Sequence, residues 1–335
     1  MEDNYGHRIS YLRVSVTDRC NERCNYCMPD EEQQWLGRKD VLSFEEMMRV
    51  IRAGVSLGIS KIRVTGGEPL TRPGVIGFLK EVALLEPIKN LGISTNGTLL
   101  ARKLGKDTEP AAAGLFAAGV TALNLSLDTL DREFYAKTTG RDYLPMFHDG
   151  LQAAREAGFQ RIRINTVLMR GRNEHELWDL IEFARENECI LRFIEMMPVS
   201  TRQVLTEDNF LSAGEARKII EFKYGELEPM PEFRTNGPAV YYRLPKTGQR
   251  IGFINAMSNL HFCESCDKLR LTADGKLRPC LGSHLEFDVR EALRDPSTTD
   301  EDLRQIFRDV VDRKPKDHDF RDNYEPDRRM IAIGG

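Results

Sequence analysis

The stretch SYLRVSVTDRCNERCNYC, Ser10 to Cys27, decides the fold. Its first seven residues alternate apolar and polar side chains, a pattern typical of a β-strand with one buried face. Three of the seven cysteines of the chain then follow within eight residues, with no fourth cysteine in reach. We expect these thiols in the loop that follows the carboxyl end of the strand, which is where parallel α/β barrels keep their chemistry.

The overall composition excludes several classes of protein. The 335 residues are 41% hydrophobic and 30% charged, with a net charge of −4, so no global basic excess points to nucleic acid. The N-terminus lacks the apolar core of a signal peptide, and no apolar run reaches the length of a membrane helix. We therefore expect a cytoplasmic protein, in which clustered cysteines bind metal rather than form disulfides.

Five further runs repeat the alternation of the first strand, and helical patterns separate them. Six strand–helix units in series predict a parallel sheet with right-handed crossovers. One helix is predicted to begin with a capping box formed by Ser43 and Glu46, and another with the same relation between Asn173 and Glu176. The five further strands are predicted at 61–65, 90–95, 121–127, 161–168 and 190–195.

Side chains alternate along each predicted strand, so that every strand has an apolar face and a polar face. Burying the four arginines of the polar faces without partners would be costly, so an anion must fill the interior. We expect an α/β fold, an incomplete (β/α)6 TIM-like barrel with an open side. A half-exposed antiparallel sheet also alternates, but the helical crossovers favour parallel pairing. The polar faces carry Arg13, Ser15, Arg63, Thr65, Ser94, Asn96, Asn124, Ser126, Asp128, Arg163, Asn165 and Arg192.

The character of the sequence changes after residue 225. Residues 239–254 predict a β-hairpin that turns at 245–248, and residues 268–281 predict a second that turns at Asp274 and Gly275. We therefore expect two domains: a partial barrel over 1–225, and a small C-terminal α+β module over 226–335. This module carries a second cysteine triad, Cys263, Cys266 and Cys280.

Cys20, Cys24 and Cys27 suit an iron–sulfur cluster better than a structural zinc ion, which usually takes four protein ligands. A four-iron cluster with three protein ligands leaves one iron open for a substrate or cofactor. A zinc site completed by a distant residue is the alternative. The turn TGGEP at 65–69 adds glycines that let a ligand approach the backbone, and Glu68, which can accept from an ammonium group.

The spacing of the second triad fits two kinds of metal site equally well. A zinc ion could take His261 or His284 as its fourth ligand, since three cysteines and one histidine are a common set. An iron–sulfur cluster is the other reading, and the basic residues Lys268, Arg270 and Arg278 favour a cluster beside an anionic ligand.

The first triad, with Tyr26 before its last cysteine, resembles the radical S-adenosylmethionine (SAM) superfamily. The resemblance implies a partial barrel and a [4Fe-4S] cluster on Cys20, Cys24 and Cys27, with SAM bound to the open iron. Reductive cleavage of SAM then yields a 5′-deoxyadenosyl radical, and the protein positions the reactants and excludes water.

Motifs along nearly the whole chain resemble the GTP 3′,8-cyclase family, which catalyses the first step of molybdenum cofactor biosynthesis. They include KIRVTGGEPL, STNG, LNLSLDTLD, RFIEMMP, CESCDKLRLTADGKLRPCL and the terminal Gly-Gly. The resemblance implies that the radical removes hydrogen from ribose carbon 3′ of GTP, and that this carbon attacks carbon 8 of guanine. The product is (8S)-3′,8-cyclo-7,8-dihydroguanosine 5′-triphosphate.

The same resemblance implies roles for individual residues. A second [4Fe-4S] cluster on Cys263, Cys266 and Cys280 binds the purine of GTP, and Arg192 is a catalytic candidate that steers the radical intermediate. Arg163, Lys268 and Ser94 stand where relatives often carry lysine, arginine and threonine. SAM-binding positions are Tyr26, Gly67, Ser126 and Met197; GTP-binding positions are Arg13, Arg63, Ser94, Arg163, Lys268, Leu269 and Arg270.

The resemblance also implies partners. These are a one-electron donor such as flavodoxin or ferredoxin, and cyclic pyranopterin monophosphate synthase as the recipient of the product. No nucleic acid or membrane partner is expected, and a homodimer is an alternative to a monomer. The tail that ends in Gly334 and Gly335 is expected to reach the active site. Two rivals remain: a radical SAM enzyme with an auxiliary cluster that modifies a peptide, and a zinc-stabilised adaptor.

Overall fold

The computed structural model describes residues 1–28, 34–105, 108–200, 205–322 and 324–334. These residues form one curved sheet of twelve strands, in the order β12-β11-β10-β1-β2-β3-β4-β5-β6-β9-β8-β7. Neighbours are parallel from β10 through β9, and the two outer hairpins are antiparallel. The predicted parallel α/β partial barrel is confirmed, and the antiparallel alternative is wrong.

The six predicted barrel strands are all present, each within one residue of its expected limits. Their apolar faces form the main core: Leu12, Val14, Ile62, Val64 and Leu125 are at most 1% exposed. The strands are β1 Tyr11–Ser15, β2 Lys61–Thr65, β3 Asn90–Thr95, β4 Ala122–Ser126, β5 Ile162–Leu168 and β6 Ile190–Glu195.

Both C-terminal hairpins form as predicted, and they extend the barrel sheet at its two edges. In the first hairpin β9 pairs in parallel with β6, and in the second β10 pairs in parallel with β1. The division into domains at 225/226 stays a prediction, because strands from both parts share one sheet. The strands are β7 Glu228–Pro229, β8 Val240–Arg243, β9 Arg250–Ile254, β10 Lys268–Leu271, β11 Lys276–Arg278 and β12 Phe287–Asp288.

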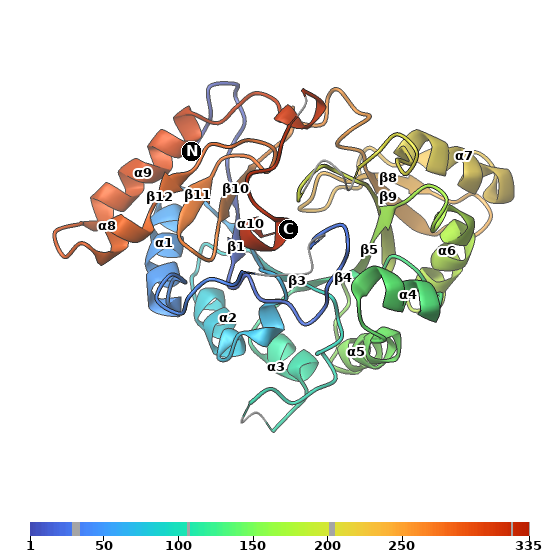
Figure 1. Ribbon diagram of the computed structural model, residues 1–335, viewed down its shortest axis with the longest axis horizontal. Helices are drawn as coiled ribbons and strands as arrows, with labels where there is room; N and C mark the ends of the chain where they lie inside the picture. The colour runs from blue at the N-terminus through green and yellow to red at the C-terminus, as the bar shows by residue number, and fades with distance from the viewer. Residues whose placement is uncertain (29–33, 106–107, 201–204, 323, 335) are drawn as a thin grey trace.

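Helices cover the outer face of the sheet, while the C-terminus lies inside the arc of strands (Figure 1). The short helices are η1 Pro69–Thr71, η2 Glu174–Glu176, η4 Asp319–Arg321 and α10 Met330–Ile333. The others are α1 Phe44–Ser56, α2 Val75–Ala83, α3 Ala111–Ala117, α4 Arg132–Thr139, α5 Leu144–Glu156, α6 Leu177–Glu186, α7 Ala213–Tyr224, α8 Arg290–Arg294 and α9 Asp300–Asp312. None of the described helices has the length and apolar character needed to cross a membrane.

One of the two predicted capping boxes is present. The Ser43 hydroxyl accepts from the Glu46 amide, and the Glu46 carboxylate accepts from the Ser43 amide. The prediction for Asn173 is wrong, because its side-chain amide donates to the carbonyls of Asp128 and Val167 instead. A tertiary contact between two strand ends has therefore replaced a local helix cap.

The topology separates the two cysteine triads. Cys20, Cys24 and Cys27 follow β1 and so lie at the carboxyl ends of the parallel strands. Cys263 and Cys266 precede β10, and Cys280 follows the antiparallel β11, so the second triad lies at the amino ends. A five-residue strand such as β1 spans about 13 Å, which leaves room for a nucleotide between the triads.

Candidate functional site

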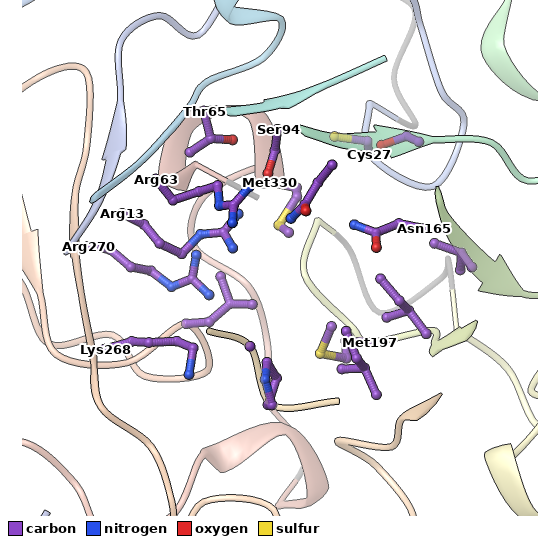
Figure 2. Close-up of a pocket in the computed structure, with 18 of the residues that line it drawn as sticks. Arg13, Cys27, Arg63, Thr65, Ser94, Asn165, Met197, Lys268, Arg270 and Met330 are labelled. Atoms are coloured by element: carbon purple, nitrogen blue, oxygen red, sulfur yellow. The ribbon is translucent and has the colours of Figure 1, made fainter. Parts of the chain in front are cut away.

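A cavity of about 360 Å³ fills the barrel interior, and both triads line it. Figure 2 shows Arg13, Arg63, Lys268 and Arg270 extending into this cavity from one side, with Asn165 and Met197 across from them. The predicted site residues in the lining are Arg13, Cys20, Cys24, Tyr26, Cys27, Arg63, Gly67, Ser94, Ser126, Arg163, Arg192, Met197, Cys263, Cys266, Lys268, Arg270 and Cys280.

Leu269 is the one predicted site residue whose side chain lies elsewhere. It is fully buried in the hydrophobic core, on the face of β10 opposite to Lys268 and Arg270. The contact of Leu269 with GTP stays a prediction, and only its backbone is available for it. The alternation of side chains along a strand is the physical reason.

Five arginines from five strands form what we call the arginine belt: Arg13, Arg63, Arg163, Arg192 and Arg270. In the sheet register, Arg13 lies between Arg63 and Arg270. Burial, followed by repulsion from Arg270, lowers the pKa of Arg13 to about 9, and burial lowers the pKa of Arg192 to about 10. Buried guanidinium groups gathered in this way favour an anionic ligand.

Three arginines of the belt, Arg63, Arg192 and Arg270, donate hydrogen bonds to neutral groups. Arg63 donates to the Tyr11 hydroxyl at 3.0 Å and to the Ile93 carbonyl at 3.1 Å. Arg192 donates to the Asn165 amide oxygen at 2.9 Å. Within the described part of the chain, the buried Arg163 Nε and Asn124 Oδ1 have no hydrogen-bond partner. Buried polar atoms of this kind call for a polar ligand.

Tyr11 is a cavity residue that the sequence reasoning missed. Burial alone would raise its pKa, but the charges of Arg63 and Arg13 lower it to about 8. The sequence could have revealed it, because Tyr11 lies two residues before Arg13 in the same strand and therefore faces the same side of the sheet.

The first triad lies among carboxyl groups. Burial raises the pKa of the Cys27 thiol to about 12, and burial together with Glu22 raises the pKa of Cys24. The Tyr26 hydroxyl donates to Asp128 at 2.7 Å, which holds the ring beside the triad.

The turn after β2 packs on the loop that carries the first triad. The Gly67 amide donates to the Thr17 carbonyl at 2.7 Å, and a Cβ on Gly67 would lie 2.4 Å from the Arg19 carbonyl oxygen. Glycine is therefore required here for a backbone contact within the protein. The Glu68 carboxylate accepts from Leu70, Thr95 and Asn96, which fixes its orientation, and its contact with an ammonium group stays a prediction.

The second triad lies among basic groups. Burial raises the pKa of the Cys263 thiol to about 11, whereas Lys314 and Lys268 outweigh burial and lower the pKa of Cys266. Neither histidine offered as a zinc ligand lines the cavity. The side chain of His261 is 76% exposed and binds Glu264, and that of His284 stacks on Tyr324.

The C-terminal tail enters the cavity from α10, and Met330 and Ile331 line it. The Met330 amide donates to the Ser200 hydroxyl, which donates to the Cys27 carbonyl. Arg270 donates to the Gly334 carbonyl at 2.9 Å. Gly335, the last residue of the predicted tail, lies outside the described residues.

Three further parts of the lining carry no sequence pattern that could have revealed them. They are the segment 235–238, His318 and Phe320. His318 is 6% exposed, and its Nε2 lies 2.9 Å from the Ala256 carbonyl. These residues reach the cavity through the tertiary fold alone.

The residues present fit iron–sulfur chemistry. Three thiols stand at the carboxyl ends of the strands without a fourth cysteine, which is the donor set of a cluster with one open iron. The orphaned polar atoms of Arg163 and Asn124 face the same cavity lining. A cluster, a cofactor and an anionic substrate can therefore share this interior.

Comparison with known proteins first defines the class. The radical SAM superfamily model matches residues 14–184, and the Molybdenum Cofactor Synthesis C model matches residues 189–320. The fold is similar to that of Streptococcus suis SuiB bound to S-adenosylmethionine, with a TM-score of 0.62 at 15% identity over 88% of this chain and 65% of that chain. It is similar also to anSMEcpe with bound AdoMet, with a TM-score of 0.59 at 14% identity over 92% and 82% of the two chains.

Sequence relatives then define the family. The chain is 39% identical to the GTP 3′,8-cyclase of Thermodesulfovibrio yellowstonii over the whole of both chains. It is 44% identical to GTP 3′,8-cyclase 2 of Pseudomonas aeruginosa, covering 95% of this chain and 93% of that one. The chain belongs to the GTP 3′,8-cyclase family, within the radical SAM superfamily.

Proposed function

We propose that this chain, as a GTP 3′,8-cyclase of molybdenum cofactor biosynthesis, binds GTP in the barrel interior between two [4Fe-4S] clusters. The observation that carries the proposal is the arginine belt, which stands between two cysteine triads in one cavity. Neither a peptide-modifying enzyme nor a zinc adaptor accounts for this belt. SuiB, which has been solved with a precursor peptide, shares only the fold, at 16% identity.

The arginine belt binds the triphosphate in this proposal. Arg13, Arg63 and Arg270 stand side by side on three neighbouring strands, and Arg163 approaches from β5. Arginine forks match phosphate oxygens in geometry as well as charge. A bound triphosphate would compensate the burial of these cations, which supports Arg13, Arg63, Arg163, Arg270, Lys268 and Ser94 as substrate-binding residues.

Cys20, Cys24 and Cys27 of the first triad would hold the cluster that binds SAM. When bound, the cluster and SAM together supply the 5′-deoxyadenosyl radical. Tyr26, Gly67, Ser126 and Met197 line the adjoining part of the cavity and are proposed to hold SAM. The hydrogen bond from Tyr26 to Asp128 orients this wall. Because SAM is a cation, the nearby carboxyl groups favour its binding.

The second triad, Cys263, Cys266 and Cys280, is proposed to hold the second cluster and to receive the purine. It stands at the opposite ends of the strands, so a nucleotide can reach it while its ribose faces the first triad. Neither His261 nor His284 lines the cavity beside these cysteines, which supports a cluster here rather than a zinc site.

Arg192 is the proposed catalytic residue. Arg192 is 4% exposed, and its guanidinium is oriented by the hydrogen bond to Asn165. In this position it holds a fixed positive charge against the bound nucleotide, where electron density accumulates during reduction of the cyclised intermediate.

The reaction also requires a one-electron donor, and we propose flavodoxin or ferredoxin for this role. Cyclic pyranopterin monophosphate synthase is the proposed recipient of the product. The tail is proposed to close the cavity, because Gly334 contacts Arg270 and Met330 contacts the loop of the first triad through Ser200.

Anaerobic reconstitution with iron and sulfide tests the proposal. We expect about eight irons per chain, and a cyclised nucleotide on addition of SAM, dithionite and GTP. Release of 5′-deoxyadenosine should be slow without GTP. Two zinc ions per chain, or a product that retains an intact guanosine, would refute it.

A further inference from the structure

Lys314 is a buried lysine that neither the sequence motifs nor the proposed reaction use. It follows α9 and is 4% exposed. Its Nζ donates to the carbonyls of Pro279, at 2.6 Å, and Lys268, at 3.2 Å. Lysine is rarely buried in this way unless its charge is paired.

The two carbonyls that Lys314 binds belong to the backbone beside the second triad. Pro279 directly precedes Cys280, and Lys268 lies two residues after Cys266. One ammonium group therefore ties the beginning of β10 to the end of β11, the two segments that carry these cysteines. The spacing between the two thiols depends on that link.

The charge of Lys314 lies beside the second triad. The two acceptors of the ammonium are neutral carbonyls, which satisfy hydrogen bonds but do not neutralise charge. A cation buried in this way is stabilised by a nearby anion, and a cluster on the adjacent thiolates would supply that anion.

We propose that Lys314 is a positioning residue for the second triad: it fixes the backbone segments of Cys266 and Cys280 and places a positive charge beside the cluster that they would hold. The inference rests on the second cluster proposed above. Positive charge beside a cluster favours its more negative, reduced form, so Lys314 raises the reduction potential of the second cluster. Such outer-shell groups also increase metal affinity.

The chain offers matched variants for a test. Lys314→Gln removes the charge and keeps donors, Lys314→Arg keeps the charge, and Lys316→Gln changes an exposed lysine two residues away. Each is made in the full chain and again with Cys24→Ala, which leaves only the second triad intact. The measurements are iron release to a chelator and the midpoint potential of the second cluster, followed by electron paramagnetic resonance.

We expect Lys314→Gln to release iron from the second cluster about tenfold faster and to shift its midpoint potential to more negative values. Lys314→Arg should retain the potential, and Lys316→Gln should match the unsubstituted chain in both measurements. Unchanged iron release and potential in Lys314→Gln would overturn the inference. If Lys314→Gln does not fold, Lys314→Arg serves as the test. The inference is overturned if the midpoint potential of Lys314→Arg shifts as far to negative values as removal of one charge would cause.

The two proposals fail in distinguishable ways. An unsubstituted chain that holds no iron on the second triad refutes the second cluster, and the inference with it. A second cluster whose iron release and midpoint potential are the same in every Lys314 variant refutes only the inference about Lys314.

Discussion

The two cysteine triads occupy opposite ends of one cavity in opposite electrostatic surroundings. The first follows β1 and lies near Glu22 and Asp128, whose pKa values burial raises to about 7 and about 6. The second adjoins β10 and β11 and lies near Lys268 and Lys314. The cavity therefore has an acidic end and a basic end.

This difference teaches that the surroundings of a triad, more than its spacing, separate the two roles. Both triads offer three thiols and both line the same cavity. Carboxyl groups favour a cationic ligand, which SAM is, while ammonium and guanidinium groups favour an anionic one. The polarity of the cavity thus supports the proposed direction in which SAM and GTP would bind.

Removal of one thiol from each triad should separate the two roles and has the largest expected effect. Cys24→Ala should abolish both SAM cleavage and product formation, because the open iron of the first cluster is lost. Cys266→Ala should abolish product formation but retain slow release of 5′-deoxyadenosine. Chromatography of both products measures this, with iron content as the control: each variant should keep about four irons.

Equal loss of SAM cleavage in both variants would break the comparison, because the two ends would then not act independently. The buried Cys189 provides a matched control. Cys189→Ser should keep both activities, since its thiol packs in the core away from the cavity.

Arg270→Ala should weaken GTP binding about tenfold to a hundredfold, the effect of losing a hydrogen bond between charged groups. SAM binding at the acidic end should be unchanged. Arg161→Ala, which removes an exposed arginine at the beginning of β5, is the control. Equilibrium binding of GTP to the reconstituted protein measures the effect, and loss of iron in Arg270→Ala would count against its role as a phosphate ligand.

Strand parity was enough to predict the polar interior. Arg13, Arg63, Arg163 and Arg192 were assigned to one face from alternation alone, and all four line the cavity. The prediction worked because a strand places every second side chain on the same face whatever its neighbours are. The same rule, applied strictly, would have added Tyr11 and would have placed the side chain of Leu269 in the core.

Long-range contacts could not be predicted in this way. No local sequence pattern indicates that β10 pairs with β1. This pairing brings Arg270 beside Arg13. Asn173 also has a plausible local role as a helix cap, yet it binds the carbonyls of Asp128 and Val167. In both cases the folded chain brings together residues that are distant in the sequence. Contacts between such residues compete with local interactions such as a helix cap.

GTP binding should weaken as the pH rises above about 8. Arg63, Arg13 and Lys268 face the Tyr11 hydroxyl and stabilise its ionised form in the free protein. A bound triphosphate neutralises these cations, which raises the pKa of Tyr11, so binding takes up a proton. The dissociation constant should therefore increase about fivefold between pH 8 and about pH 9.

Tyr11→Phe isolates this effect at the basic end. The variant should show a smaller pH dependence of GTP binding over the same range, while SAM binding changes equally in both proteins. Parallel titrations of the two proteins give the difference directly. Identical GTP profiles would assign the pH dependence to the nucleotide or to other residues.

The smallest effect is expected from Leu269→Ile, which tests how the segment Lys268-Leu269-Arg270 contacts GTP. Leu269 faces the core, so the change of shape should lower the free energy of unfolding by about 1 kcal/mol. GTP affinity should stay within about twofold, because the backbone of β10 is kept. Lys268→Met, on the cavity face, should weaken GTP binding clearly more. If Leu269→Ile instead weakened GTP binding as much as Lys268→Met at equal stability, the side chain and not the backbone would be the contact, and the assignment of faces along β10 would be wrong.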